Sequence, residues 1–363
     1  MKICRITRPP LKEVTTKFPQ REHHVLGRLE KKGHTIMQYK IRPVKVPTKY
    51  LSYGIGLILS VVRYYKVRAD VIIADNMESA FVAMFIRFFY RTPFVIDFID
   101  DYSLIARDDS FILRYYLIRF LERYVPKYAD LIIVVDEHKR RFCLKIGIPE
   151  ESVVLVPNGT ETDVFRPDTL PGDLLKDHSL EDRNIIMFIG RLNRYYRVET
   201  IIEAAPHVVK KFPDAKFVLI GEGYQKKELI NMSRKFGVSD VILFTGFMSP
   251  DEISGCIACA DVCYFPLPDS SALAIYEYMA CGKPTVIPEY STEKMGINDD
   301  ILPDDCFLKV ENTSLGIAGG INLLLEDKYL RRHMGEKARK FVENGYDWDE
   351  IASRYESALS SLR

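Results

Sequence analysis

The sequence predicts an α/β protein built from two Rossmann-like, doubly wound domains that face a central cleft. Short β-branched runs alternate with amphipathic stretches of helix length along both halves of the 363-residue chain, as is typical of parallel sheets covered by helices. The alternation is interrupted once, by a stretch containing proline, glycine and several acidic residues. Such a composition is typical of a linker between domains.

The order of these runs gives the expected domain limits. The first domain covers residues 1–165, with strand-like runs KICRIT, HTIMQY, DVIIAD, PFVIDF, DLIIVVD and VVLVPNG. Residues 166–183 form the expected linker. The second domain, at 184–345, alternates NIIMFIG, AKFVLIG, VILFTG, DVCYFP and PTVIP with helix-like stretches. We expect the last segment, 346–363, to be a helix that packs back on the first domain.

Charge is distributed unevenly along the chain. Residues 1–170 hold 28 Lys and Arg against 20 Asp and Glu, whereas residues 171–363 hold 23 against 30. The basic half contains no recognised nucleic-acid-binding motif, so nucleic acid is not an expected partner. The first residues lead directly into a strand-like run without the zones of a secretory signal, and the apolar runs are too short to span a bilayer. These features predict a cytoplasmic protein.

Basic and aromatic residues interleave in two helix-like stretches of the first domain, 87–91 and 111–127. On a helix that begins at Phe111, Tyr116, Phe120 and Arg123 share one side. Apolar rings with basic flanks suit the surface of an anionic membrane, which predicts peripheral attachment to the cytoplasmic face of a membrane. Alternatively, the rings face the domain core and the arginines line its solvated edge. The arginines in the second stretch are Arg114, Arg119 and Arg123.

The second domain carries residues suited to a ligand with two phosphates. Arg191 follows a strand and Gly190, so its guanidinium group can emerge at the edge of the sheet and bind phosphate oxygens. A helix is expected to start shortly after Asp269, and the free amides of a helix start attract anions. The start of this helix comprises Ser270, Ser271, Ala272 and Leu273.

Two further turns in the second domain follow strands. Gly221 and Gly223 flank Glu222, and their missing side chains would let the backbone approach a ligand, although an ordinary strand-to-helix turn has the same pattern. Phe247 follows the run FTG and could border a nucleotide base or fill space beneath its loop. No HExxH, DxD or similar motif supplies a metal site in a suitable context, so no metal is expected.

Four landmarks occur in one order along the second domain: IGRL at 189–192, LIGEG at 219–223, FTGF at 244–247 and EYMACGKP at 277–284. With these landmarks the chain resembles the GT-B family of retaining, nucleotide-sugar-dependent glycosyltransferases. KKGHT and VPNGTETDVFRP extend the resemblance to the first half. It implies an enzyme with a UDP- or GDP-sugar donor, a glycan or lipid-linked acceptor, and no metal or other cofactor.

The resemblance also implies roles for individual residues. Arg191 would bind the diphosphate, Glu277 the ribose hydroxyls, and Asp269 the hydroxyls of the transferred sugar. Asp100 would supply a polar group at the edge of the first domain, and with Arg191 and Asp269 it forms the expected catalytic set. The expected donor-binding set is Gly190, Arg191, Arg197, Gly221, Glu222, Gly223, Phe247, Ser270, Ser271, Ala272, Leu273 and Glu277.

The sequence departs from the family at several positions, among them Asp269, where the family has a glutamate, and the first loop, which lacks the family's glycines. The family places a lysine and then a glycine five and six residues after the arginine, where this chain has Tyr196 and Arg197, so that Arg197 or Arg194 would have to supply the second cation. In the first domain, Ile99 stands where the family has a histidine. These departures leave an alternative function, a non-catalytic nucleotide-sugar or carbohydrate binding protein. A sugar phosphorylase or epimerase would share the fold as well.

Overall fold

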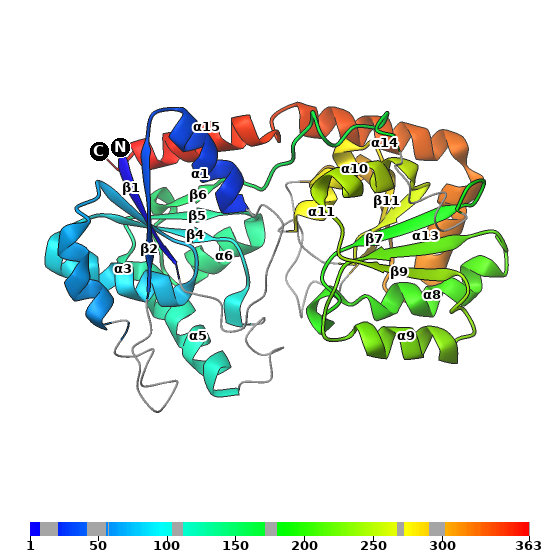
Figure 1. Ribbon diagram of the computed structural model, residues 1–363, viewed down its shortest axis with the longest axis horizontal. Coiled ribbons are helices and arrows are strands. Elements are labelled where there is room, and N and C mark those ends of the chain that lie inside the picture. The colour runs from blue at the N-terminus through cyan, green and yellow to red at the C-terminus, as the bar shows by residue number, and fades with distance from the viewer. Residues whose placement is uncertain are drawn as a thin grey trace. The chain divides into compact units, whose positions relative to one another are not determined.

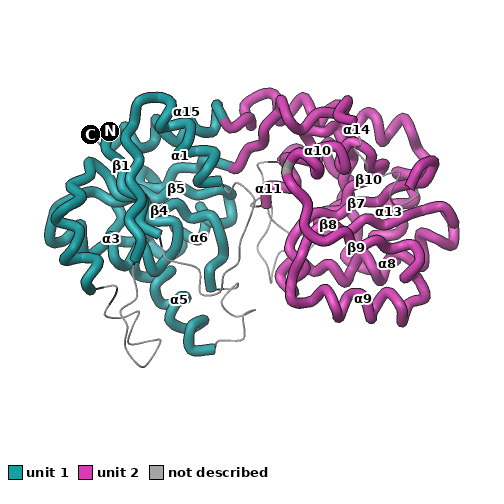
Figure 2. The backbone as a smooth tube through the Cα atoms, viewed as in Figure 1, with its two compact units in different colours: residues 1–157, 349–363 teal, residues 158–348 magenta. Residues whose placement is uncertain are grey.

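The computed structural model describes residues 1–7, 21–41, 56, 58–103, 112–170, 180–266, 272–289 and 302–362. The chain forms two compact units (Figure 2), one made of Met1–Pro157 with Asp349–Arg363 and the other of Asn158–Trp348. Each unit contains a six-stranded sheet in which all paired strands run parallel (Figure 1). The predicted fold class, two parallel α/β sheets, is therefore confirmed. The sequence-derived domain limits, with a linker at 166–183, stay predictions.

The first unit has the strand order β2-β1-β3-β4-β5-β6. The short runs VIIA and LIIV of β3 and β5 are buried along their whole length, because a parallel sheet is covered on both faces. The strands are β1 (Lys2–Thr7), β2 (Thr35–Lys40), β3 (Val71–Ala74), β4 (Phe94–Phe98), β5 (Leu131–Val134) and β6 (Val153–Leu155). The helices are α1 (Arg21–Lys31), α3 (Met77–Tyr90), α5 (Ile112–Tyr124), α6 (Glu137–Lys145) and α15 (Trp348–Ser360), with 3-10 turns η1 (Tyr64–Lys66), η2 (Val125–Tyr128) and η3 (Glu150–Ser152).

The second unit has the strand order β12-β11-β10-β7-β8-β9. The strands are β7 (Ile185–Ile189), β8 (Lys216–Ile220), β9 (Ile242–Gly246), β10 (Val262–Tyr264), β11 (Thr285–Glu289) and β12 (Phe307–Glu311). The helices are α8 (Glu199–Val209), α9 (Lys226–Lys235), α10 (Pro250–Cys259), α11 (Leu273–Ala280), α13 (Ser314–Glu326) and α14 (Lys328–Glu343), with 3-10 turns η4 (Arg194–Tyr196) and η5 (Asp304–Cys306).

Strand order reverses once in each sheet. In the second unit the chain runs outward from β7 to β8 and β9, then returns to the other side of β7 with β10. In the first unit the reversal lies between β1 and β3. The helices that follow two such neighbouring strands lie on opposite faces of the sheet, which opens a crevice at their carboxyl ends. This topology places the candidate site of the second unit between β7 and β10.

The last helix, α15, belongs to the first unit except for its first residue. Its residues Ile351, Tyr355 and Leu359 are buried. Arg28 of α1 donates to Asp349 over 2.5 Å, and the Nε2 atom of His34 lies 2.7 Å from a carboxylate oxygen of Glu356. The helix α15 therefore adds buried side chains to the core of the unit that residues 1–157 form. Of the helices within the described ranges, none combines the length and the apolar character that crossing a bilayer requires.

Candidate functional site

The reversal point of the second sheet brings the end of β7 next to the start of α11. β7 pairs with β10 through Ile186 and Val262, and the helix that follows β10 is α11. Arg191 comes two residues after the end of β7. Because the strands are parallel, both connections leave the sheet at the same edge. The arginine and the amino-terminal end of a helix, two groups that attract anions, therefore share one edge of one sheet.

A direct hydrogen bond fixes α11 to the end of β7. The backbone N–H of Ile189 donates to the phenol oxygen of Tyr278 over 2.7 Å. Tyr278 is fully buried, and burial raises its pKa well above the ordinary range, so the phenol stays neutral. The sequence gives no local signal for this bond, because its two residues lie 89 positions apart in the chain. The bond sets the position of Glu277, which is the preceding residue on the same helix.

Glu277 is the most perturbed carboxyl group at this edge. The surrounding protein desolvates it, and burial raises its pKa to about 7. Its side chain keeps some exposed surface, and within the described ranges no residue donates a hydrogen bond to it or pairs with it. A desolvated carboxylate gains from a donor that is brought by a ligand. Glu277 is thus suited to accept hydrogen bonds from hydroxyl groups.

The cations at this edge differ in their accessibility. Arg191 and Arg194 are exposed, and the guanidinium group of Arg191 has no hydrogen bond or ion pair to another residue in the described part of the chain. Arg197 is partly buried and adopts the left-handed conformation, with φ of 48°. The preceding ring, Tyr196, packs on the core of the second unit, and a Cβ atom at Gly190 would lie 3.2 Å from it. Arg197 therefore occupies a backbone position that favours glycine, and Tyr196 turns inward.

The turns after β7 and β8 are in close backbone contact. A Cβ atom at Gly221 would lie 1.9 Å from the carbonyl oxygen of Gly190, and one at Gly223 would lie 2.2 Å from that of Leu192. The N–H of Leu192 donates to the carbonyl of Glu222 over 3.1 Å. The glycines were expected to leave room for a ligand, but the neighbouring turn of the protein occupies this space. Their first role is to let two strand ends approach each other.

Two other expected residues lie at the end of the neighbouring strands. Glu222 is exposed and pairs with Lys226 over 2.5 Å, one helical turn further on. This lysine adds a cation to the edge that the sequence analysis did not consider, although the spacing of Glu222 and Lys226 signals the pair. Phe247 follows β9 and is 39% exposed. Its side chain is therefore only partly covered by the protein.

The helix start differs from the expected one. The N-cap residue of α11 is Ala272, and no side chain caps the helix there. Ser270 and Ser271, which were expected at the helix start, lie together with Asp269 outside the described residues. Leu273 is the first helical residue. The first amide groups of a helix have no intrahelical acceptor, so they can serve an anion.

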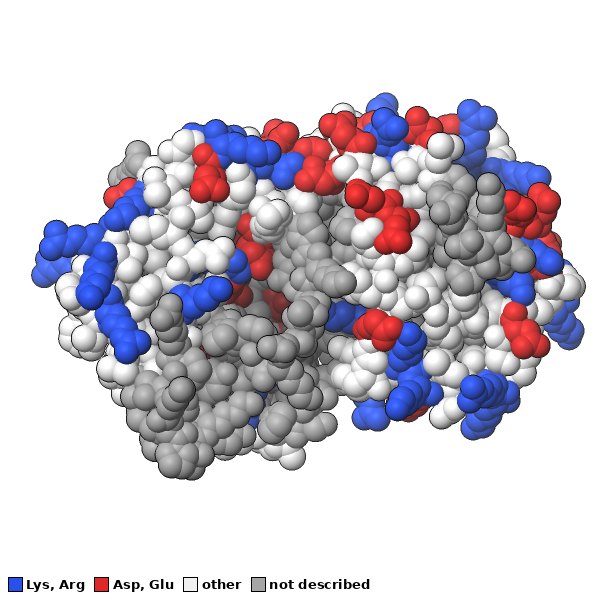
Figure 3. All heavy atoms as spheres, in the orientation of Figure 1, with Lys and Arg blue, Asp and Glu red and all other residues white. Residues whose placement is uncertain are grey.

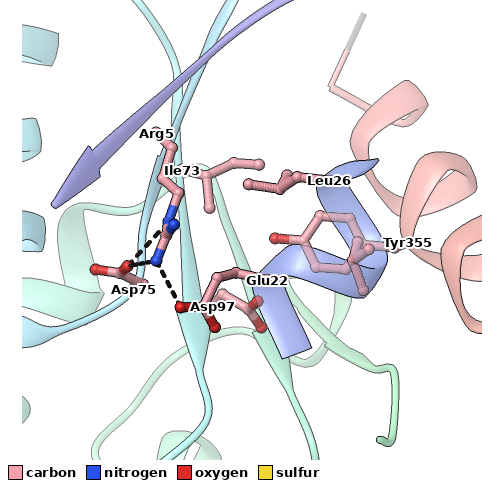
Figure 4. A pocket seen from close by; sticks show the side chains of 8 residues that line it. Arg5, Glu22, Leu26, Ile73, Asp75, Asp97 and Tyr355 are labelled. Atoms are coloured by element: carbon pink, nitrogen blue, oxygen red, sulfur yellow. Dashed lines mark hydrogen bonds and ion pairs between the residues drawn. The ribbon is translucent and has the colours of Figure 1, made fainter. Parts of the chain in front are cut away.

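In the first unit, charged side chains occupy the corresponding reversal point between β1 and β3. Figure 4 shows Arg5 directed at Asp75 and Glu22, with hydrogen bonds of 2.5 and 2.8 Å. Asp97 and Tyr355 line the same cavity, whose volume of about 10 Å³ has room for one water molecule. Burial raises the pKa of Asp75 to about 6 although Arg5 opposes it. These groups bind one another and leave little room for a ligand.

Asp100 belongs to the first unit, two residues after the end of β4, and is exposed. The structure describes it with that unit alone, so its expected contact with a donor sugar stays a prediction. Ile99 precedes it and is partly buried. No group of three or more His, Cys, Asp or Glu side chains is arranged to hold a metal ion in the described ranges.

Comparison with known proteins gives two family matches that together span most of the chain. The family described as "Glycosyl transferases group 1" matches residues 174–341, and the "Glycosyl transferase 4-like domain" matches residues 24–159. An uncharacterized glycosyltransferase of Methanocaldococcus jannaschii is 24% identical over 332 residues, which cover 86% of this chain and 82% of that protein. The GDP-mannose-dependent alpha-(1-6)-phosphatidylinositol monomannoside mannosyltransferase of Mycobacterium tuberculosis is 27% identical over 237 residues. That alignment covers 62% of this chain and 60% of the mycobacterial protein, which is less than two thirds of its length.

Solved structures share the fold at low sequence identity. HepE of Anabaena, solved with UDP and glucose, has a TM-score of 0.77 and 18% identity, with 99% of this chain and 100% of that chain covered. Sucrose-phosphate synthase of Thermosynechococcus elongatus has a TM-score of 0.81 and 16% identity, with 99% and 98% covered. Together with the topology described above, these likenesses show the GT-B fold, and the two family matches show a glycosyltransferase, a class that uses nucleotide-sugar donors. Within that class the chain belongs to the glycosyl transferases group 1 family, whose members retain the anomeric configuration.

Proposed function

We propose that the protein transfers a sugar from a UDP- or GDP-sugar to a hydroxyl group of a glycan or lipid-linked acceptor. One observation carries this proposal. At the reversal point of the second sheet, Arg191, the start of α11 and the desolvated carboxyl group of Glu277 follow two neighbouring strands. A cation, helix amides and a carboxylate at one edge match the diphosphate and the ribose hydroxyls of a nucleotide sugar.

The reaction breaks the bond between the sugar and the diphosphate, so negative charge develops on the leaving phosphate. Arg191 and the first amides of α11 stabilise this charge. Glu277 accepts hydrogen bonds from the ribose, and Asp269 is assigned to hydroxyls of the sugar. In a retaining transfer the leaving phosphate itself can accept the proton of the acceptor hydroxyl on the same face of the sugar. Asp100 is assigned as a polar group toward the donor sugar from the first unit.

The names of two relatives support a lipid-linked acceptor. The mycobacterial relative is named for a phosphatidylinositol monomannoside, and a Salmonella typhimurium relative, 24% identical over 247 residues, for lipopolysaccharide. Both names describe transfer to an acceptor attached to lipid. We extend this acceptor class to the present chain, with the protein at the cytoplasmic face of a membrane.

A second candidate, a nucleotide-sugar binding protein without transfer activity, is favoured by the turn after β7. Tyr196 packs on the core where the family carries a lysine, and Arg197 adopts the conformation suited to the family's glycine. The cation at this turn is thus placed differently, which would weaken stabilisation of the leaving group more than binding of the donor.

Two measurements on the purified protein separate the candidates. A thermal-shift screen with UDP-, GDP- and ADP-sugars identifies the donor, because a ligand that binds only the folded state raises the melting temperature. Release of free nucleoside diphosphate from that donor over time then reports hydrolysis or transfer. Stabilisation with release supports the enzyme, and stabilisation without release under any acceptor supports the binding protein. A protein that none of these sugars stabilises would contradict both.

A further inference from the structure

The first unit exposes an unusually apolar helix surface, which we call the outer face of α5. Its side chains are between 45% and 79% exposed. Aliphatic and aromatic side chains of this size are rarely gathered in solvent unless the surface binds something. The outer face of α5 comprises Ile112, Leu113, Tyr116, Leu117, Phe120 and Tyr124.

These side chains form one continuous arc on the helix. At about 100° per residue they fall within an arc of roughly 140°. The opposite side carries Ile118, Leu121 and Glu122, which are buried in the first unit. Thus α5 is apolar on both sides, one toward the core and one toward solvent. The rings of Tyr116 and Phe120 are 62% and 56% exposed, so the alternative that they face the core is wrong.

Neighbouring elements extend the apolar surface. α3 packs against α5 and η2, and Phe88 and Phe89 near its end are 76% and 65% exposed. The phenol of Tyr90 donates to the carbonyl of Val62 over 3.3 Å, which connects α3 to the helical residues 58–63. Val62 is itself 57% exposed. Three helical segments of the same unit therefore present large apolar side chains.

The charges around the outer face of α5 are basic. Arg119 lies at one border of the arc and Arg123 just inside that border, and both are exposed, as is Lys127 in the following turn. The two acidic side chains of α3 and α5 point away from it, since Glu122 is buried and Glu78 is 17% exposed beside Arg114. In Figure 3, further Lys and Arg side chains line the left edge of the first unit, at another part of its surface than α5. An apolar arc with basic side chains at its border complements an anionic surface, and the acidic side chains of α3 and α5 do not oppose this because they point toward the protein.

Arg114 does not belong to this basic border, contrary to the sequence-based expectation. It lies on the side of the helix that faces the protein, 3.7 Å from the carboxylate of Glu78. Arg87 also has a partner within the protein, because it donates two hydrogen bonds of 2.7 Å to Asp130. Of the cations described on α5, Arg119 and Arg123 stay exposed, and Arg119 donates a hydrogen bond of 2.5 Å to the phenol of the neighbouring Tyr115.

We propose that the outer face of α5 docks onto an anionic lipid bilayer, with its apolar side chains at the level of the acyl boundary and Arg119 and Arg123 at the head groups. The inference rests on the proposed function in one respect, which is that docking brings the enzyme to a lipid-linked acceptor. The docking itself follows from exposure and charge. A bilayer fits better than a protein partner because the exposed charged side chains described on α5, Arg119 and Arg123, are both basic, and anionic head groups attract each arginine.

The test is sedimentation of the full chain with vesicles of phosphatidylcholine alone or mixed with phosphatidylglycerol. We expect binding to the mixed vesicles only, weakened by salt. Arg119→Gln with Arg123→Gln should lower the affinity about 30-fold, or about fivefold for each charge. Leu113→Ser with Phe120→Ser should abolish binding. The matched control is Lys227→Gln with Lys235→Gln, which removes the same charge from exposed positions of α9 and should change nothing.

The outcomes that overturn the proposal are distinct from failure of the proposed function. Equal binding by the arginine variant and the control, or no vesicle binding at all, would refute the docking. A dimer in light scattering that Leu113→Ser with Phe120→Ser dissociates, without vesicle binding, would instead assign this face to a second copy of the chain. Release of nucleoside diphosphate without vesicles tests the enzyme separately, and the arginine variant should retain it. Melting temperatures of all variants confirm that they fold.

Discussion

At the scale of single residues, Glu277 and Arg197 hold positions that cost stability. A carboxyl group with a pKa raised to about 7 is less favourable in its ionised form inside the protein than in water. Arg197 adopts a left-handed backbone conformation that only glycine adopts without strain. Both residues lie near the edge assigned to the donor, where such costs are expected when they serve binding.

Donor binding should depend on the ionisation of Glu277. As pH falls from about 8 to about 6, the carboxylate becomes protonated and loses its capacity to accept two hydrogen bonds, so we expect the dissociation constant of the intact nucleotide sugar to rise. Replacement by alanine should cost about 1.5 to 3 kcal/mol in kcat/KM. Calorimetric titration at several pH values measures the first effect, and initial rates measure the second.

Glu277→Gln provides the control for that dependence, since it keeps the shape and removes the ionisation. Its donor affinity should be independent of pH in this range. Because the folded pKa is raised, the stability contribution of the wild-type carboxyl group is present below its unfolded pKa and is lost as pH rises through about 7. The glutamine variant should therefore unfold at a higher temperature than the wild type at alkaline pH. A wild-type affinity that does not change with pH would remove Glu277 from the donor site.

Arg197→Gly should stabilise the protein and weaken donor binding. Relief of the left-handed conformation is worth about 1 kcal/mol in the free energy of unfolding. The same exchange at Arg194, which lies in the 3-10 turn η4, should destabilise by a similar amount because glycine adds freedom to the unfolded chain. Urea titration gives the stabilities, and the donor affinities of the two variants identify the second cation. Unchanged affinity in Arg197→Gly would transfer that role to Arg194.

At the scale of elements, the turns after β7 and β8 form one interlocked unit. Gly221 has φ of 144° and touches Gly190 across the gap between the strands. This contact holds the segment that carries Arg191 against the segment that carries Glu222. The positions of Arg191 and Glu222 at this edge of the sheet therefore depend on how the backbones of the two turns pack together.

Gly221→Ala should unfold the second unit far more easily than Gly237→Ala. Both glycines have positive φ, of 144° and 70°, but a Cβ atom at Gly237 meets nothing within 4 Å. Strain should lower the free energy of unfolding of Gly237→Ala by about 1 kcal/mol. The added clash should lower that of Gly221→Ala by more than about 3 kcal/mol. The only tryptophan, Trp348, is buried in this unit and reports its unfolding by fluorescence. Similar losses in the two variants would show that the turns separate at little cost.

The sequence predicts elements better than contacts, for physical reasons. Alternating apolar runs reveal β7 and β8, and the residues that follow strand ends, such as Arg191, are local in sequence. The hydrogen bond between Ile189 and Tyr278 was missed because it joins distant segments. The sequence left open which side of α5 faces solvent, because a helix that is apolar on two sides has no single polar face that would identify this side.

At the scale of the whole molecule, the chain passes between its two units twice, at Pro157 and at Trp348. The second unit is one continuous segment, whereas the first is assembled from two. The returning helix contributes Tyr355, which lies in the charged cavity with Asp97 and against which Arg21 stacks, with 5.8 Å from guanidinium carbon to ring centroid. The stability of the first unit therefore depends on residues at the far end of the sequence.

Deletion of residues 349–363 should destabilise the first unit and spare the second. The deletion removes the buried side chains Ile351, Tyr355 and Leu359 and leaves Arg21 without its ring contact. Limited proteolysis followed by mass spectrometry should show rapid cleavage within residues 1–157 and a resistant fragment from the second unit. Equal resistance of both units would show that α15 is dispensable for the first unit.

The divided first unit has a consequence for synthesis on the ribosome. Domains usually fold in the order in which they emerge, the amino-terminal one first. Here the second unit has all its residues once Trp348 has emerged, while the first still lacks the helix that covers α1. The unit that is translated first is thus completed after the second, because its apolar surfaces wait for residues 349–363. A premature stop directly after Trp348 would spare the unit that we assign to the donor and disable the one that we assign to the membrane.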